Sequence, residues 1–359
     1  MSLEPETHKT IVGRGVASNP TNRFERVRVP FDPLDDYFEP QDLKTDTQYF
    51  KDSTRSFITY NDSPDIGFKA SVNPYRGCEH GCIYCFARPT HEYLGFSAGL
   101  DFETRIMVKL DAPELLRKEL SAKKGQPQVV GFSGVTDIYQ PVERHLELTR
   151  RCLEVFLEFR NPVGIVTKNY LITRDLDLLK ELAQFDCISV TVSLATLDEE
   201  LRRVMEPRTS SPTRRLKAVE MLANAGIPVG VLNAPIIPGL TDQEIPALVR
   251  AAADAGASWA GYNIVHLPYG LKELFVDWLG RHFPERVGKV LGRIKDVRGG
   301  KLNDPRFGYR MTGEGLYAEQ IRQLHKVACK QAGLPKAKHR LSTEHFRVPG
   351  KVVQMGLFE

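Results

Sequence analysis

The sequence predicts an α/β fold, namely a partial (β/α)6 barrel of the TIM type with an extended N-terminal arm and a helical C-terminal extension. Two observations predict this fold. Between residues 66 and 266, short apolar segments alternate about six times with longer segments of helical periodicity. The apolar segments are continuous, which is typical of strands that are covered on both faces in a parallel sheet. A chain of 359 residues is long enough for one such barrel with extensions.

The predicted elements alternate in a regular order. We expect strands at residues 66–73, 128–133, 163–167, 187–194, 228–233 and 261–266. Helices are expected between them, at residues 113–123, 142–160, 174–185, 213–225 and 242–255. Gly226 is expected to stop the fourth helix and Asp242 to cap the fifth.

The two ends of the chain differ from this pattern. Prolines interrupt any periodicity in residues 1–50, so this segment is predicted to be an extended arm. Basic residues come first in the arm, before acidic ones: Lys9, Arg14, Arg23, Arg26 and Arg28, then Asp32, Asp35, Asp36, Glu39 and Asp42. A solvated arm that wraps the surface is favoured over a basic clamp on a phosphate-bearing substrate.

The C-terminal part is expected to be helical from residue 271 to 332, with a loop at 298–312. A basic tail follows, which we expect to pack back over the domain or to reach towards substrate; it carries Lys336, Lys338, Arg340, Arg347 and Lys351. The predicted division is thus an arm at 1–60, a barrel at 61–268 and an extension with its tail at 269–359.

Composition excludes some classes of protein. No run of about 18 apolar residues is present, so no membrane span is predicted, and the N-terminus lacks the apolar stretch of a secretory signal. Of the six cysteines, three are clustered and three are dispersed, which does not indicate a disulfide framework and favours the cytoplasm. The net charge of +4 is too small to predict a polyanionic partner by itself.

The chemistry of the chain is expected at one short loop. Cys78, Cys82 and Cys85 have the spacing C-x3-C-x2-C, so all three sulfurs can face one centre. In an iron–sulfur cluster, which usually takes one cysteine per iron, three ligands leave one iron open to a group that is not protein.

Two other interpretations of the cysteine loop stay open. With His80 or His91 as a fourth ligand, it would form a Cys3His zinc site, although zinc sites usually combine two separated ligand pairs. The other interpretation, in which the thiols have no ligand, is disfavoured because the three thiols are clustered and Gly77 and Gly81 give the backbone around them conformational freedom.

Active residues of a parallel barrel lie at the C-terminal ends of the strands. This rule selects the cysteine loop and five further places: Ser133 to Asp137, Thr167 to Asn169, Ser193, Asn233 to Thr241, and His266. The dispersed thiols Cys152, Cys187 and Cys329 are expected to be buried and inert. Glu206 and Arg208 are expected to form a structural pair.

The cysteine spacing, with Tyr84 directly before Cys85, resembles the signature of the radical SAM superfamily. The resemblance implies that Cys78, Cys82 and Cys85 hold a [4Fe–4S] cluster and that S-adenosylmethionine chelates the fourth iron. It further implies reductive cleavage of that cofactor to a 5′-deoxyadenosyl radical and an electron donor such as flavodoxin or ferredoxin. The usual core of that superfamily is a partial (β/α)6 barrel.

Other segments are similar to the spore photoproduct lyase branch, namely residues 133–137, 202–218 and 226–236. In that branch a cysteine in the loop after the second strand returns a hydrogen atom to the product radical. The matching position here is Gly134, which has no thiol. The resemblance therefore implies a relative of that lyase.

The resemblance also implies that Lys168 and Ser193 touch the cofactor and that Ser133, Thr136 and Asp137 belong to a similar loop beside it. From their positions, Tyr84 is expected to pack around the cluster, and a contact of Arg208 with the cofactor carboxylate is the alternative to its pair with Glu206. A lysine ammonium suits a carboxylate, and serine hydroxyls can both donate to and accept from a ribose.

Two functions follow from these observations. The first is a radical enzyme that abstracts hydrogen from an unidentified substrate, with nucleic acid the first expectation because of the lyase resemblance and the basic ends. The second is a zinc-organised nucleic-acid binding module without turnover. The sequence assigns no further catalytic residue and no oligomeric state.

Overall fold

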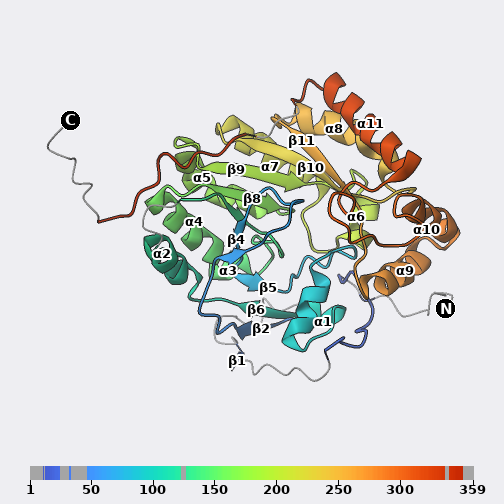
Figure 1. Ribbon diagram of the computed structural model, residues 1–359, viewed down its shortest axis with the longest axis horizontal. Helices are drawn as coiled ribbons and strands as arrows, with labels where there is room; N and C mark the ends of the chain where they lie inside the picture. Colours follow the sequence, from blue (N-terminus) through green and yellow to red (C-terminus); the bar gives the residue numbers. More distant parts are fainter. Residues whose placement is uncertain are drawn as a thin grey trace.

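The sheet of the computed structural model is the partial barrel that the sequence predicts (Figure 1). The structure describes residues 11, 13–24, 32–33, 47–122, 127–335 and 339–350, with residues 32–33 as backbone only. Seven strands have the order β11-β10-β9-β8-β7-β4-β3. Their bounds are β3 Thr59–Tyr60, β4 Ala70–Val72, β7 Val130–Phe132, β8 Val163–Thr167, β9 Ile188–Ser193, β10 Val229–Ile236 and β11 Ala260–Ile264.

Six of these strands run parallel, and each occurs in chain order beside the next. Only β3 is antiparallel, where it pairs with β4 at the edge. Among the described strands β11 has no pairing with β3, so the sheet stays open. The strand prediction is confirmed, although the first strand is shorter than residues 66–73.

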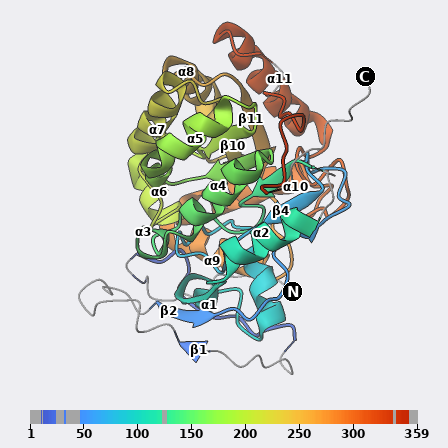
Figure 2. The ribbon, with the colours of Figure 1, turned by 90° about the vertical axis from the view of Figure 1, so that its left-hand side faces the viewer.

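A layer of helices packs against the sheet and shares an apolar core with it (Figure 2). Every residue of β9 is buried, as expected for a strand between two layers. The helices are α2 Ala112–Ala122, α3 Glu143–Leu146, α4 Leu148–Phe159, α5 Leu176–Ala183, α6 Glu199–Met205, α7 Pro212–Asn224 and α8 Ile245–Asp254. Gly226, with a φ of +75°, directly follows the Ala225 cap of α7, so the predicted stop is confirmed.

Two local predictions about helices are wrong. The helix expected at 142–160 is divided at Glu147, which lies between α3 and α4. Its φ of +50° is not helical and therefore interrupts the helix. Asp242 does not cap α8, because it begins the short 3-10 turn η4 (Asp242–Glu244) instead. Its carboxylate accepts a hydrogen bond of 2.9 Å from the Gly239 backbone N–H. Another 3-10 turn, η3 (Tyr170–Asp175), leads into α5.

A second, four-stranded sheet carries the cysteine loop, and the sequence pattern did not reveal it. Its order is β1-β2-β6-β5, with β1 Asp32–Pro33, β2 Gln48–Lys51, β6 Arg105–Val108 and β5 Tyr75–Arg76. The cysteine loop leaves β5, and the turn η2 (Arg88–Leu94) and helix α1 (Leu100–Thr104) lead back to β6. Part of the predicted arm thus contributes strands instead of wrapping the surface.

The C-terminal extension consists of helices, as predicted: α9 Leu271–His282, α10 Val287–Asp296 and α11 Gly315–Gln331. A short 3-10 turn, η5 (Pro284–Arg286), lies between α9 and α10. Ile321 of α11 shares a buried cluster with Ile245 and Val249 of α8. Among the described helices none has the length and apolar character for crossing a membrane. The domain limits near residues 60 and 268 stay a prediction.

Candidate functional site

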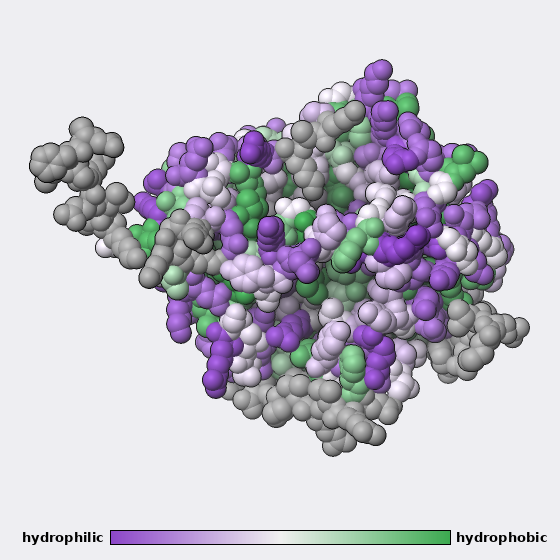
Figure 3. Space-filling model, in the orientation of Figure 1, coloured by the Kyte–Doolittle hydropathy of each residue, from purple (hydrophilic) through white to green (hydrophobic). Residues whose placement is uncertain are grey.

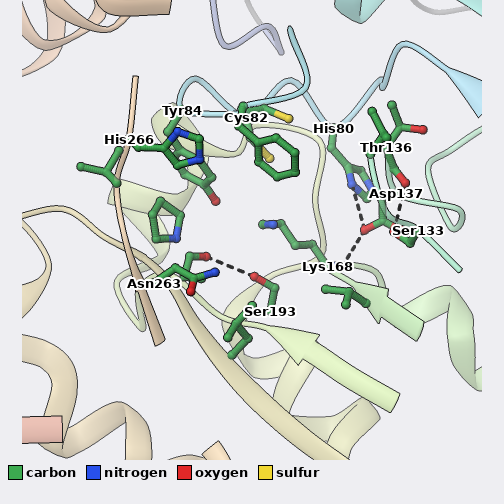
Figure 4. Close-up of a pocket in the computed structure, with 18 of the residues that line it drawn as sticks. His80, Cys82, Tyr84, Ser133, Thr136, Asp137, Lys168, Ser193, Asn263 and His266 are labelled. Atoms are coloured by element: carbon green, nitrogen blue, oxygen red, sulfur yellow. Dashed lines mark hydrogen bonds and ion pairs between the residues drawn. The ribbon is translucent and has the colours of Figure 1, made fainter. Parts of the chain in front are cut away.

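A cavity of about 280 Å³ lies at the C-terminal ends of the parallel strands (Figure 4). It brings the three clustered cysteines together with residues from the ends of five strands, β7 to β11. Of the predicted site residues, the cavity is lined by Cys78, Cys82, Tyr84, Cys85, Ser133, Thr136, Asp137, Lys168 and Ser193. The outer surface in Figure 3 is largely hydrophilic at its periphery, with hydrophobic residues more frequent towards the middle of the view.

The cysteine loop is held by its backbone. Gly77 and Gly81 have φ values of +80° and +67°, which glycine adopts without a steric penalty. The Cys78 backbone N–H donates to the Phe102 carbonyl (2.8 Å), and the N–H of Ile83 donates to the Met205 carbonyl (3.0 Å). The loop is thereby fixed to α1 on one side and to α6 on the other.

All three thiols are free and none is fully exposed. Cys78 and Cys82 are 6% and 7% exposed, and Cys85 is half-buried. Three cysteine sulfurs at one cavity match the donor set of an iron–sulfur cluster with one open iron. Within the described ranges, no group of three or more His, Cys, Asp or Glu side chains is arranged as a site for a single metal ion.

Neither histidine considered for a zinc site completes one with the cysteines. His91 packs against the rings of Phe96 and Phe102 and does not line the cavity. His80 lines the cavity, but burial lowers its pKa to about 4, so its ring is neutral. Its Nδ1 lies 3.4 Å from Asp137, and its Nε2 lies 3.1 Å from the side-chain nitrogen of Asn169. These partners assign the proton to Nδ1 and the acceptor role to Nε2.

Asp137 ties the loops after β7 and β8 together. Its carboxylate accepts hydrogen bonds from the Thr167 hydroxyl (2.8 Å) and from the backbone N–H of Lys168 (2.7 Å). Since the same carboxylate also faces His80, it fixes Lys168 relative to the cysteine loop.

Lys168 extends into the cavity (Figure 4). Its Nζ lies 5.9 Å from the centre of the Tyr84 ring. Burial by itself lowers the pKa of Lys168, but the neighbouring Cys82 sulfur and the negative charge of Glu206 outweigh it and raise the pKa. Among the described residues no hydrogen bond or ion pair uses this Nζ, so the ammonium is available to a ligand.

A buried ion pair lies behind the cavity wall. Glu206 accepts a hydrogen bond from the Tyr84 hydroxyl and pairs with Arg215. Arg215 also donates to the carbonyl oxygens of Ser193 (3.0 Å) and Ser210 (2.8 Å). The predicted pair of Glu206 with Arg208 is therefore wrong, because Arg215 on the inner face of α7 takes that place.

Residues 72–252 match the family model described as Radical SAM superfamily. The chain belongs to the radical SAM superfamily.

Several relatives have related sequences. Uncharacterised proteins of Mycobacterium tuberculosis are 39% identical over 226 residues, which cover 62% of this chain and 66% of the mycobacterial protein. The match thus spans slightly less than two thirds of those relatives. A protein named Radical SAM Nalpha-GlyT isomerase, from Pseudomonas phage M6, is 24% identical over 257 residues, with coverage of 70% of this chain and 51% of the phage protein.

Among solved structures, spore photoproduct lyase has the same fold. A mutant with bound AdoMet and dinucleoside spore photoproduct superposes with a TM-score of 0.55 at 18% identity, covering 78% of this chain and 77% of that chain. The family and this neighbour confirm the predicted partial barrel and the resemblance to radical SAM proteins. The prediction of a radical SAM enzyme is confirmed at the level of the family.

In this radical SAM protein the hydroxyl groups at the cavity already donate to backbone carbonyls. Ser193 donates to Ala234 (3.1 Å), and Ser133, whose φ is +91°, donates to Thr136 (3.0 Å). The hydroxyl of Thr136 donates to the carbonyl of Tyr75 (3.0 Å). Each oxygen keeps a lone pair with which it can accept a hydrogen bond from a ligand.

Arg208 is the predicted site residue that does not line the cavity. Its guanidinium pairs with the buried Glu79 at 3.1 Å. The predicted contact between Arg208 and the cofactor carboxylate stays a prediction.

The sequence did not point to some of the residues that line the cavity, among them Asn263, Arg310 and Met311. Asn263 lies inside a predicted strand, near the strand end where the barrel rule places active residues. Arg310 and Met311 come from the loop at 298–312, which no local pattern connects with the barrel. His266 lines the cavity as expected, and its ring stacks on Phe86 with centres 5.9 Å apart.

The basic residues of the described arm bind the protein itself. Arg14 donates to the Glu103 carbonyl (3.0 Å), and Arg23 pairs with Glu92 (2.6 Å). Arg14 and Arg23 therefore do not support the hypothesis of a basic clamp on a phosphate-bearing substrate. Lys9, Arg26 and Arg28 lie outside the described residues. In the tail, Arg347 donates to the Glu158 carbonyl (2.9 Å), which confirms packing against the domain. Lys336, Lys338 and Lys351 lie outside the described residues.

We expect substitution of Gly15 by alanine to displace the arm from the cysteine loop. A Cβ at Gly15 would lie 1.8 Å from the Gly81 carbonyl oxygen, so one of the two backbones must move. We expect the free energy of unfolding to fall by about 1–3 kcal/mol, as for an overpacked core, and denaturant unfolding measures it. Gly67→Ala is the control because that position has open space. Equal stability of the two variants would contradict this packing.

Proposed function

We propose that this protein is a radical SAM enzyme that binds a [4Fe–4S] cluster at Cys78, Cys82 and Cys85 and uses S-adenosylmethionine. The observation that supports this most directly is that three free thiols meet, at one cavity, a lysine ammonium from which no other described residue accepts a hydrogen bond. When bound, the cluster and S-adenosylmethionine supply the 5′-deoxyadenosyl radical that abstracts hydrogen from the substrate.

The side chains of the cavity bind and orient the cofactor in this proposal. The ammonium of Lys168 binds the carboxylate of S-adenosylmethionine, and Asp137 holds Lys168 in place through its backbone N–H. Ser193 accepts from the ribose hydroxyls, and Ser133 and Thr136 line the opposite loop. Tyr84 separates the cysteines from the buried Glu206–Arg215 pair, and the half-exposed ring of Phe86 shields the cavity from water.

We propose a nucleic acid as the substrate and a small electron-transfer protein, such as flavodoxin or ferredoxin, as the electron donor in the cytoplasm. The fold shared with spore photoproduct lyase, which was solved with a dinucleoside, supports the substrate class. The proposal does not include the hydrogen-returning step of that lyase branch, because the matching residue here, Gly134, has no thiol.

Anaerobic reconstitution tests the proposal. The protein is supplied with iron, sulfide, a reductant and S-adenosylmethionine, and 5′-deoxyadenosine is measured. A brown protein that forms 5′-deoxyadenosine is expected. A colourless protein that binds zinc and forms none would instead favour the zinc-organised nucleic-acid binding module.

Replacement of Lys168 by methionine is expected to weaken S-adenosylmethionine binding about tenfold or more. A charge-assisted hydrogen bond contributes about 1.5–3 kcal/mol, and methionine keeps the length of the side chain without its charge. Equilibrium dialysis of the reconstituted protein measures the affinity. Lys217→Met, which removes an exposed ammonium paired with Glu220 on α7, is the matched control. Equal affinities in both variants would exclude Lys168 from cofactor binding.

A further inference from the structure

Residues 306–312, here called the strap, join the two edges of the open sheet. At one edge the backbone N–H of Ile264, in β11, donates to the Met311 carbonyl (2.8 Å). At the other edge Asp65, in the loop between β3 and β4, accepts from the Gly308 backbone N–H (2.7 Å) and pairs with Arg310 (2.6 Å). The strap therefore spans the gap that strand pairing leaves open.

The β11 end of the strap is firmly held. The buried guanidinium of Arg298 donates to the carbonyl oxygens of Ile264 (2.8 Å) and Val265 (2.7 Å), and also to the carbonyl of Tyr309 (2.7 Å). At the opposite end the strap is held by the carboxylate of Asp65 and the hydroxyl of Ser63.

Arginine and aromatic residues alternate along the strap, in the order Arg306-Phe307-Gly308-Tyr309-Arg310. Phe307 and Tyr309 are 56% and 43% exposed. The guanidinium of Arg310 lies 4.7 Å from the centre of the Phe307 ring. Exposed rings that can stack on bases, beside cations that can bind phosphates, are the combination that single-stranded nucleic acids require.

Arg310 connects this surface with the cavity. It lines the cavity, yet its side chain is 23% exposed, so it lies at the entrance. Phe86 lines the same cavity and is 51% exposed, which places an apolar ring at the entrance as well. Nε of Arg310 binds Asp65 and Nη2 binds Ser63, while Nη1 has no hydrogen-bond partner among the described residues. A guanidinium with unused donors suits a phosphate.

We propose that Arg310 recognises a backbone phosphate of a single-stranded nucleic acid whose base enters the cavity beside Phe86. In the free protein Asp65 is the counter-ion of Arg310, and the phosphate replaces it on binding. The inference rests on the proposed function. In that proposal the carboxylate of S-adenosylmethionine binds Lys168, on the sheet side of the cavity. Arg310, which comes from the C-terminal extension, is thus left for the substrate.

Two variants with opposite expected effects test the inference. A fluorescein-labelled single-stranded DNA of about 12 nucleotides is titrated into the reconstituted protein with S-adenosylmethionine at several salt concentrations. Arg310→Gln is expected to bind about tenfold more weakly, with a log–log salt slope shallower by about 0.7, the value for one phosphate contact. Asp65→Asn is expected to bind more tightly, because it removes the competing charge and keeps an oxygen for the Gly308 N–H.

The control is Arg322→Gln, which removes an exposed arginine paired with Glu319 on α11 and is expected to leave binding unchanged. Wild-type affinity and salt slope in Arg310→Gln would overturn the inference, as would equal binding of duplex DNA. So would a loss of S-adenosylmethionine affinity in Arg310→Gln, since Arg310 would then bind the cofactor. If Arg310→Gln does not fold, Asp65→Asn decides alone, and weaker or unchanged binding there overturns the inference.

The cofactor reaction separates this test from that of the proposed function. If the inference fails alone, all variants still form 5′-deoxyadenosine from S-adenosylmethionine without a substrate. If the proposed function fails, wild-type protein forms none, whatever its affinity for the oligonucleotide.

Discussion

Cys82→Ala protein is expected to form no detectable 5′-deoxyadenosine after anaerobic reconstitution. Cys82 is the middle one of the three proposed ligands, is 7% exposed and lines the cavity. Removal of its sulfur leaves only two cysteines in the loop. The proposed cluster needs three, one for each iron except the open one. We also expect the iron content after desalting to fall well below that of wild-type protein. Both quantities, iron per chain and product per hour, are measured on the same preparation.

The matched control removes a cysteine elsewhere in the chain. Cys329 lies in α11, is half-buried beside His325 and does not line the cavity. Cys329→Ala is expected to retain the iron and the 5′-deoxyadenosine of wild-type protein. Retention of both in Cys82→Ala as well would remove the basis for the proposed cluster site.

Arg215→Leu is expected to give the largest loss of stability among simple substitutions near the site. The side chains of Arg215 and Glu206 are 1% and 0% exposed, so the variant leaves a carboxylate without its cation in the interior. Removal of one partner of such a pair destabilises proteins by about 3–5 kcal/mol. The shift of the urea midpoint at constant slope measures the effect.

A double variant separates the charge effect from lost packing. Glu206→Gln combined with Arg215→Leu removes both charges, and we expect it to be more stable than Arg215→Leu alone. Arg203→Leu, on the exposed face of α6, removes a guanidinium paired with Glu199 and Glu200 at the surface and is expected to change stability by less than about 1 kcal/mol. A similar loss in Arg203→Leu and Arg215→Leu would show that burial of the ion pair is not the cause.

The main sheet is predictable because its signal is local. Apolar segments such as 163–167 and 188–193 are continuous, and segments with helical periodicity follow them. This alternation of strand and helix predicts a parallel sheet without any knowledge of distant contacts. The second sheet lacks such a signal. Its strands are two to four residues long, and β2 pairs with β6 across more than fifty residues, so no periodicity can develop within either segment.

The same distinction applies to the site. The cysteine loop, Asp137, Lys168 and Ser193 could be predicted because a general rule places active residues at strand ends. The partner of Glu206 could not be predicted, because several arginines lie nearby in the sequence. Which of them pairs with Glu206 depends on which side of the helix faces the interior. Arg214 is exposed on α7, whereas its neighbour Arg215 is buried. Arg310 could not be predicted either, since only tertiary contacts bring its loop to the cavity.

The separation of Asp65 from Arg310, 245 residues along the chain, has a consequence for biosynthesis. A ribosome adds about 5–20 residues per second, so roughly 12 to 50 seconds pass between the translation of these two residues. During that interval Asp65 has no Arg310 with which to pair, so the loop between β3 and β4 receives this ion pair only after the C-terminal extension has been synthesised.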